Sequence, residues 1–297
     1  MNIAFYALQS GLNNNGGTNT IVGTVKALRA LGHNAFIISI VDNYTMEDHP
    51  QCISVPAPAD VVVGVSYMDI ERMHCDYPNT PKCWWMRLWD SDKIQDAEIH
   101  ALANAQPVIT NAHWIRQRLL QVGCHAVLLR QGIDDEFWVP DASKRNGHVI
   151  GTCFRPEPRK RYYDFALLKD YMSKNDGLKF DSVIGLDKVR LRDWYQSIEF
   201  YISPSRMEGC PNAVIEAALC GCKIIARRNP EAGVIELLSE KQAYLYDDIA
   251  EVPKMLQYEI DNTGVRERLI SLCGTKTNCA LKMLSFLQEV INTYDEI

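Results

Sequence analysis

The strongest constraint on the fold is residues 200–226, where the spacing of apolar residues changes twice. A short apolar run at 200–203 is typical of a buried strand. Pro211 suits the first turn of a helix, and apolar residues then recur at helical spacing. Gly221 suits the turn that ends a helix, and the run at 223–226 resumes as a strand. Strand, loop, helix, turn and strand in this order predict an α/β fold with a parallel sheet.

Two carboxylates mark this stretch, Glu208 before the helix and Glu216 within it. The N-terminus of a helix attracts anions, whereas carboxylates accept hydrogen bonds from hydroxyls. A nucleotide sugar offers both partners, because it carries a diphosphate, a ribose and sugar hydroxyls. By spacing alone, a capping glutamate and a solvated helical glutamate explain the pattern equally well.

Residues 204–225 resemble the E-x7-E signature of family 4 glycosyltransferases, which have the GT-B fold. The match covers Pro204-Ser205, Glu208-Gly209, Pro211-Asn212, Glu216-Ala217 and the turn at Gly221. The resemblance implies that Glu208 contacts the donor sugar and that Glu216 binds the ribose hydroxyls. It also implies a donor-binding role for the residues between them, Gly209, Cys210, Pro211 and Asn212.

A basic loop, residues 155–161, follows an apolar run at 148–154. Such a loop at the end of a strand suits a diphosphate, although a solvated surface loop has the same composition. Its spacing resembles a second family segment, which implies that Arg155 and Lys160 neutralise the leaving diphosphate. Arg161 departs from that segment, which has glycine at this position. We assign three more residues to nucleotide binding, Gly185, Lys188 and Val189.

The N-terminal segment reads as a strand at 3–8, a glycine-rich loop at 11–18 and a helix. In the family the equivalent loop lies between acceptor and donor phosphate, which implies this role for Gly16, Gly17 and Thr18. The family usually carries a histidine after its fourth strand, near the C6 hydroxyl of the donor sugar. The corresponding region here has none, so either Asp90 substitutes or the donor lacks that hydroxyl, as a pentose would.

Strands and helices alternate along the remaining chain. We expect Ser91 to cap a helix reaching about residue 105, and Asn111 to cap a helix ending at Gly123. Residues 141–147 are polar and turn-rich, as interdomain linkers are. Together with the resemblance, the pattern predicts two Rossmann-like parallel-sheet domains facing a central cleft. Their expected limits are 1–143 on the acceptor side and 144–275 on the nucleotide-sugar side, with a helix at 276–297 crossing back to the first domain.

The charge balance disfavours a nucleic-acid partner without excluding one. The net charge is −6, and residues 1–149 carry 11 Lys and Arg against 15 Asp and Glu, a balance of −4. No apolar run is long enough for a transmembrane helix, and the N-terminus lacks the pattern of a signal peptide. The ten cysteines contain no C-x-x-C pair and are expected to be buried free thiols in a reducing cytoplasm.

The resemblance implies a cytoplasmic, retaining glycosyltransferase that needs no metal and no cofactor beyond its donor substrate. The acceptor is left open between a glycan, a lipid-linked sugar and a small molecule. One alternative is transfer to a modified base in phage-type DNA, since the chain is short for the family and has local basic clusters. Another is a binding protein that has lost catalysis.

Overall fold

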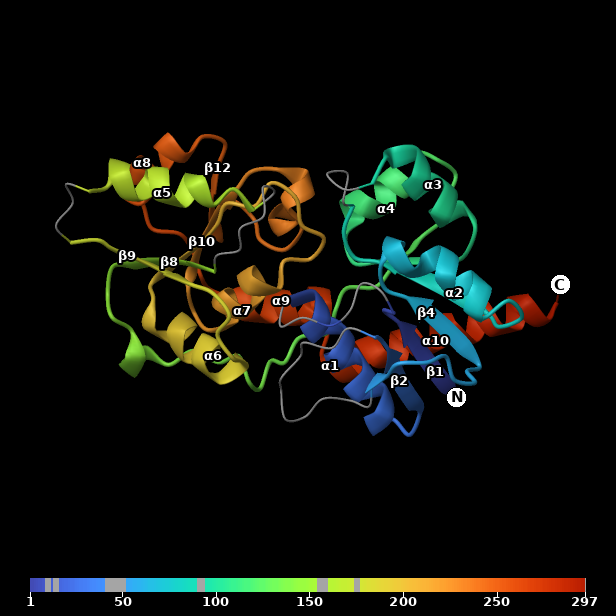
Figure 1. Ribbon diagram of the computed structural model, residues 1–297. Coiled ribbons are helices and arrows are strands. Elements are labelled where there is room, and N and C mark those ends of the chain that lie inside the picture. Colours follow the sequence, from blue (N-terminus) through green and yellow to red (C-terminus); the bar gives the residue numbers. More distant parts are fainter. Residues whose placement is uncertain are drawn as a thin grey trace. The chain divides into compact units, whose positions relative to one another are not determined.

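The computed structural model describes residues 1–8, 12, 16–40, 52–89, 94–153, 160–173 and 177–296. It has two parallel sheets with helices, which confirms the predicted α/β class (Figure 1). The chain forms two compact units, one from Met1–Ile133 with Cys273–Ile297 and one from Asp134–Leu272. The domain limits expected from the sequence stay predictions. No helix among these residues is both long and apolar enough to cross a bilayer.

The first unit contains a seven-stranded sheet in the order β3-β2-β1-β4-β5-β6-β7, in which all neighbouring strands pair in parallel. Its strands are β1 (Asn2–Tyr6), β2 (Asn34–Ile38), β3 (Cys52–Ile53), β4 (Val61–Gly64), β5 (Lys82–Met86), β6 (Val108–Thr110) and β7 (Val127–Leu128). Its helices are α1 (Gly16–Ala30), α2 (Ile70–Asp76), α3 (Asp96–Asn104), α4 (His113–Leu120) and α10 (Lys276–Asp295).

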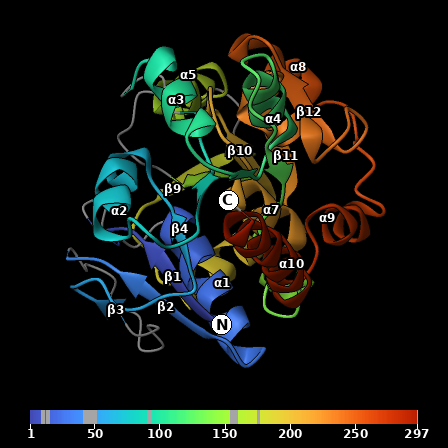
Figure 2. The same cartoon turned by 90° about the vertical axis from the view of Figure 1, so that its right-hand side faces the viewer.

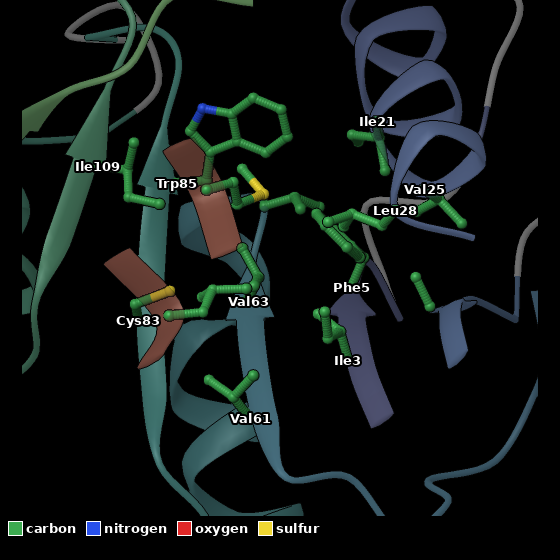
Figure 3. Packing of buried hydrophobic residues seen from close by; sticks show 14 of the residues in the cluster. Ile3, Phe5, Ile21, Val25, Leu28, Val61, Val63, Cys83, Trp85 and Ile109 are labelled. Carbon is green, nitrogen blue, oxygen red and sulfur yellow. The ribbon is translucent and has the colours of Figure 1, made fainter. Parts of the chain in front are cut away.

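Alternate residues of these strands form the core of the first unit. Ile3, Phe5, Val63 and Trp85 share one face of the sheet and meet the apolar side of α1 (Figure 3). The C-terminal helix α10 lies beside α1 and closes the same core (Figure 2), with Ala280, Met283, Phe286, Leu287 and Val290 buried in it. The end of the sequence therefore completes a core that its beginning starts.

The return of the chain to this unit depends on a close backbone contact. A Cβ on Gly132 would lie 2.5 Å from the Cα of Lys276 and 2.6 Å from the carbonyl oxygen of Thr275. The next residue, Ile133, donates its N–H to the carbonyl of Gly274 at 3.0 Å. Glycine is needed at position 132 because the two chain segments touch there without room for a side chain.

The second unit contains a five-stranded sheet in the order β12-β11-β10-β8-β9. Its strands are β8 (Val149–Cys153), β9 (Lys179–Val183), β10 (Phe200–Ser203), β11 (Lys223–Arg227) and β12 (Ala243–Tyr246). Its helices are α5 (Tyr162–Tyr171), α6 (Lys188–Ser197), α7 (Asn212–Leu219), α8 (Val252–Met255) and α9 (Val265–Cys273). Residues of α5 and α8 pack with Ile150, Phe200, Ile202 and Ile225 on one face, and α7 contacts β10 and β11.

Two expected helix starts are wrong. Helix α3 begins at Asp96 after an extended Gln95, five residues later than Ser91, which itself lies outside the described residues. Helix α4 begins at His113 and its N-cap position is Ala112, without a side-chain cap. The Asn111 side chain instead donates its amide to the Gln131 side chain at 3.2 Å, so a buried tertiary contact replaces the expected local cap.

Candidate functional site

The strand order of the second sheet reverses direction between β8 and β10. The chain runs from β8 outward to β9 and then crosses over to β10 on the other side of β8. From these two neighbouring strands the chain therefore continues to opposite ends of the strand order. Ligands of open parallel sheets bind at such a point, outside the carboxyl ends of the strands. Lys160 belongs to the loop that follows β8 and Glu208 to the loop that follows β10.

An ion pair joins the two loops at this point. The Nζ of Lys160 donates to the Oε1 of Glu208, and the two side chains are only 20% and 15% exposed. The structure thus brings together two of the residues predicted to act on the donor. Arg155, the third, lies outside the described residues. A cation and a carboxylate held side by side can address a phosphate and a hydroxyl of one ligand.

A third loop, residues 228–233 after β11, holds the Glu208 loop in place. The backbone N–H of Glu208 donates to the carbonyl of Glu231 at 2.7 Å, and the Asn229 amide donates to the carbonyl of Arg206 at 3.0 Å. Gly233 has a φ of +72°, and a Cβ there would lie 2.3 Å from the carbonyl oxygen of Gly209. The position of Glu208 is therefore set by backbone contacts between two loops.

Helix α7 presents its N-terminus at the end of this loop. Pro211 occupies the N-cap position with φ −73° and ψ 99°, and its own side chain makes no capping hydrogen bond. Pro211, Cys210 and Gly209 are buried, and Asn212 is partly exposed. The partial positive charge of a helix N-terminus stabilises an anion placed before it. The local sequence thus provides positive potential beside Lys160.

Glu216 lies on the second turn of α7, and its charge influences the pKa of Cys153, the last residue of β8. Burial, together with the charge of Glu216, raises the pKa of the Cys153 thiol to about 11, although the Tyr195 hydroxyl 3.4 Å away and the Lys160 charge both lower it. A carboxylate and an ammonium that both act on the last residue of β8 lie near the same edge of the sheet. Glu216 therefore lies within electrostatic reach of the end of β8, and its proposed role in binding the donor stays a prediction.

Three residues assigned to nucleotide binding lie in or before α6. The Nζ of Lys188 donates to the Oδ2 of Asp134 at 2.5 Å and lies 4.1 Å from the centre of the Phe137 ring. Val189 is 51% exposed, and Gly185 occupies a turn with a φ of +67°. Lys188 therefore ties residues 134–137 to α6, and a nucleotide role for these three residues stays a prediction.

The first unit carries the predicted glycine loop at the start of α1. Gly16 and Gly17 are the first two residues of α1, and Thr18 is buried. Asp90 lies outside the described residues. One residue was missed by the sequence reasoning. Arg87, directly after β5, donates from Nη1 to the carbonyl of Gly17 at 2.5 Å, and its pKa is lowered to about 10 by burial. The sequence feature that could have indicated Arg87 is its position as a cationic residue directly after a buried strand.

The described residues contain no group of three or more His, Cys, Asp or Glu side chains that could hold a metal ion. All ten cysteines are free thiols, and seven of them are buried. Among the residues that the structure describes, the predicted site of the second unit includes the Lys160 ammonium, the Glu208 carboxylate and the N-terminus of α7.

Comparison with known proteins supports this reading of the second unit. Residues 149–257 match the model of the family described as Glycosyl transferases group 1. The match begins at β8 and includes Lys160, Glu208 and Glu216. No curated protein sequence matches the chain.

Several solved structures share the fold over the whole chain. Sucrose-phosphate synthase from Thermosynechococcus elongatus superposes with a TM-score of 0.80 at 13% identity, covering 99% of this chain and 100% of that one. HepE of Anabaena in complex with UDP-glucose has a TM-score of 0.70 at 13% identity, covering 100% of both chains. A glycosyltransferase from Rickettsia africae has a TM-score of 0.72 at 13% identity, covering 98% of both. The fold is therefore the GT-B fold, as the sequence predicted.

Proposed function

We propose that the protein is a glycosyltransferase that takes its sugar from a nucleoside-diphosphate sugar bound by the second unit. The observation that carries the proposal is the Lys160–Glu208 pair at the point where the strand order reverses between β8 and β10. The family match over residues 149–257 includes both side chains. HepE of Anabaena, which shares the fold, was crystallised with UDP-glucose, so we propose UDP-sugars as the first donors to examine.

The charges of the site fit the departure of a diphosphate. As the bond between the sugar's anomeric carbon and the phosphate oxygen breaks, negative charge grows on the leaving group. The Lys160 ammonium and the N-terminus of α7 provide positive potential for that charge. Because this potential comes from the chain itself, we propose that transfer needs no metal ion.

The two carboxylates have separate roles in this proposal. Glu208 holds Lys160 in the ligand-free protein and accepts from a hydroxyl of the donor sugar once the diphosphate takes over Lys160. Glu216 accepts from the ribose hydroxyls and fixes the donor along α7. These roles match those implied by the resemblance to family 4 glycosyltransferases of the E-x7-E type.

We further propose that the anomeric configuration is retained. The acceptor oxygen attacks on the face from which the diphosphate leaves, and its proton passes to the departing phosphate oxygen. One carbon–oxygen bond breaks, one forms, and no protein base is required. Nuclear magnetic resonance of the product tests this directly, since an inverted anomeric centre contradicts the same-face reaction.

The donor site is tested by ligand-induced stabilisation. A ligand that binds only the folded protein raises its stability, by about 2.7 kcal/mol at a hundredfold excess over the dissociation constant. We expect UDP or another nucleoside diphosphate to raise the melting temperature of the wild type, and Lys160→Ala to abolish most of that rise.

Lys223→Ala is the matched control. Lys223 pairs with Glu199 at 3.1 Å at the amino end of the same sheet, with similar exposure of the two side chains. We expect this variant to respond to nucleoside diphosphates as the wild type does. Equal losses in both variants, or no stabilisation of the wild type by any nucleoside diphosphate, contradict the proposed donor site.

A further inference from the structure

The residue after Lys160 has an unusual backbone conformation. Arg161 has φ +47° and ψ 45°, and His148 is the other non-glycine residue with positive φ in the described part of the chain. A residue with a Cβ populates the left-handed conformation about 5- to 30-fold less than the right-handed one. Arg161 adopts it at the N-cap of α5, directly beside the Lys160–Glu208 pair.

A buried carboxylate holds Arg161 in this conformation. The Nε and Nη2 of Arg161 both donate to Asp164, at 3.2 Å to each of its oxygens, and the Asp164 side chain is 2% exposed. The backbone N–H of Asp164 donates to the carbonyl of Arg161 at 2.9 Å. Both the side chain and the backbone of Arg161 are therefore fastened to the first turn of α5.

Asp164 is itself anchored to two strands. The Nη1 of Arg227, the last residue of β11, donates to it at 2.9 Å, and the Tyr246 hydroxyl at the end of β12 donates at 3.4 Å. Bidentate arginine–carboxylate pairs combine strength with a defined geometry. This cluster, Arg161, Asp164, Arg227 and Tyr246, fixes the start of α5 to the carboxyl edge of the sheet.

We propose that Arg161 and Asp164 are positioning residues for Lys160, and that they act by keeping the chain left-handed at position 161. A change of φ and ψ at this residue rotates the preceding peptide and turns Lys160 away from Glu208. The Arg161 guanidinium is directed to Asp164 and lies 4.5 Å from the centre of the Tyr163 ring, so its contacts are structural. The effect on catalysis rests on the proposed donor site.

Alanine and glycine at position 161 separate conformation from charge. Both substitutions remove the guanidinium, but only glycine adopts the left-handed conformation without a steric cost. We expect Arg161→Ala to lower kcat for donor hydrolysis about 5- to 30-fold relative to Arg161→Gly, with a smaller change in KM. Because Arg161 lies at the surface edge of its cluster, we expect both variants to fold, which circular dichroism checks.

A second measurement does not depend on activity. The Lys160 amine is paired with Glu208, so we expect it to react slowly with acetic anhydride. The extent of its labelling, measured by mass spectrometry, then reports whether the pair is intact. We expect faster labelling of Lys160 in Arg161→Ala than in Arg161→Gly. Labelling of Lys169, on the exposed side of α5, should be the same in both.

The outcomes are distinct. Equal loss of kcat in both variants means that the guanidinium acts through its charge, and equal labelling of Lys160 in both means that the conformation does not position it; either result overturns the inference. If the wild type binds and hydrolyses no nucleotide sugar, the proposed function fails, and the labelling contrast alone then decides whether position 161 controls Lys160. A gain of activity when Arg161→Gly is added to Asp164→Asn supports the same chain of contacts.

Discussion

Replacing Gly233 by alanine should disturb the proposed donor site without changing any of its charged side chains. Gly233 has a φ of +72°, and an added Cβ would lie 2.3 Å from the carbonyl oxygen of Gly209 and 3.1 Å from that of Glu208. Ordinary van der Waals contact begins at 3.4 Å, so the Gly209 carbonyl must retreat by about 1.1 Å, the difference between 3.4 and 2.3 Å. The loop that carries Glu208 moves with it.

The cost has two parts. Alanine in the left-handed region costs about 1–2 kcal/mol, and overpacking against a backbone that must shift costs about 1–3 kcal/mol more. We therefore expect Gly233→Ala to lower the free energy of unfolding by about 2–5 kcal/mol. The displaced Glu208 and Gly209 should also weaken the binding of a nucleoside diphosphate.

Gly264→Ala is the matched control for this change. Gly264 lies in the same unit with a φ of +71°, but nothing lies within 4 Å of an added Cβ. It therefore carries the conformational cost alone, about 1–2 kcal/mol. Urea unfolding of both variants, followed by circular dichroism, gives the difference, and calorimetry gives the affinity for the nucleoside diphosphate.

The reasoning fails if the two glycines behave alike. Equal losses of stability mean that the contact between residue 233 and the Gly209 carbonyl relaxes at no cost. Unchanged nucleotide affinity in a destabilised Gly233→Ala protein means that the Glu208 loop does not contribute to the donor site. The two measurements therefore examine the packing argument and the functional argument separately.

Further predictions concern the charged groups of the second unit. Glu216→Gln should weaken nucleoside-diphosphate binding by about 1.5–3 kcal/mol in calorimetry, because a charged acceptor is lost. The same change should lower the pKa of Cys153 and speed its alkylation at a given pH, since the Glu216 charge raises that pKa; unchanged alkylation places Glu216 away from β8. Lys160→Ala should lower kcat about 10²- to 10³-fold with a smaller change in KM, and wild-type kinetics remove Lys160 from the mechanism. Transfer should persist in EDTA, and restoration by manganese of an activity lost in EDTA contradicts a metal-free reaction.

The sequence predicted the parts of the fold that depend on local pattern. The apolar runs at β1, β8, β10 and β11 identified the strands, because parallel strands buried on both faces are continuously apolar. Pro211 and the apolar residues at helical spacing after it likewise predicted α7. These features need only neighbouring residues to be recognised.

Features set by contacts between distant segments escaped prediction. Asn111 has the right residue type for an N-cap, but its amide reaches Gln131, on another strand's loop. Arg87 contacts Gly17, which is 70 positions away. The conformation of Arg161 depends on Asp164, Arg227 and Tyr246, which come together only when the sheet forms. In each of these cases the side chain or backbone is placed by tertiary contacts, which a local sequence pattern does not reveal.

The placement of α10 has a consequence for how the chain folds during its synthesis. The second unit is one continuous stretch, Asp134–Leu272, whereas the core of the first unit includes residues of α10 that the ribosome adds after that stretch is complete. Until α10 has been synthesised, the first unit keeps a face of β1, β4 and α1 uncovered. The second unit can already complete its core during that time. Vectorial synthesis usually favours the N-terminal domain, and here it favours the second. Chaperone demand should accordingly fall on the nascent first unit, where the part of the core that α10 covers stays exposed until that helix has been made.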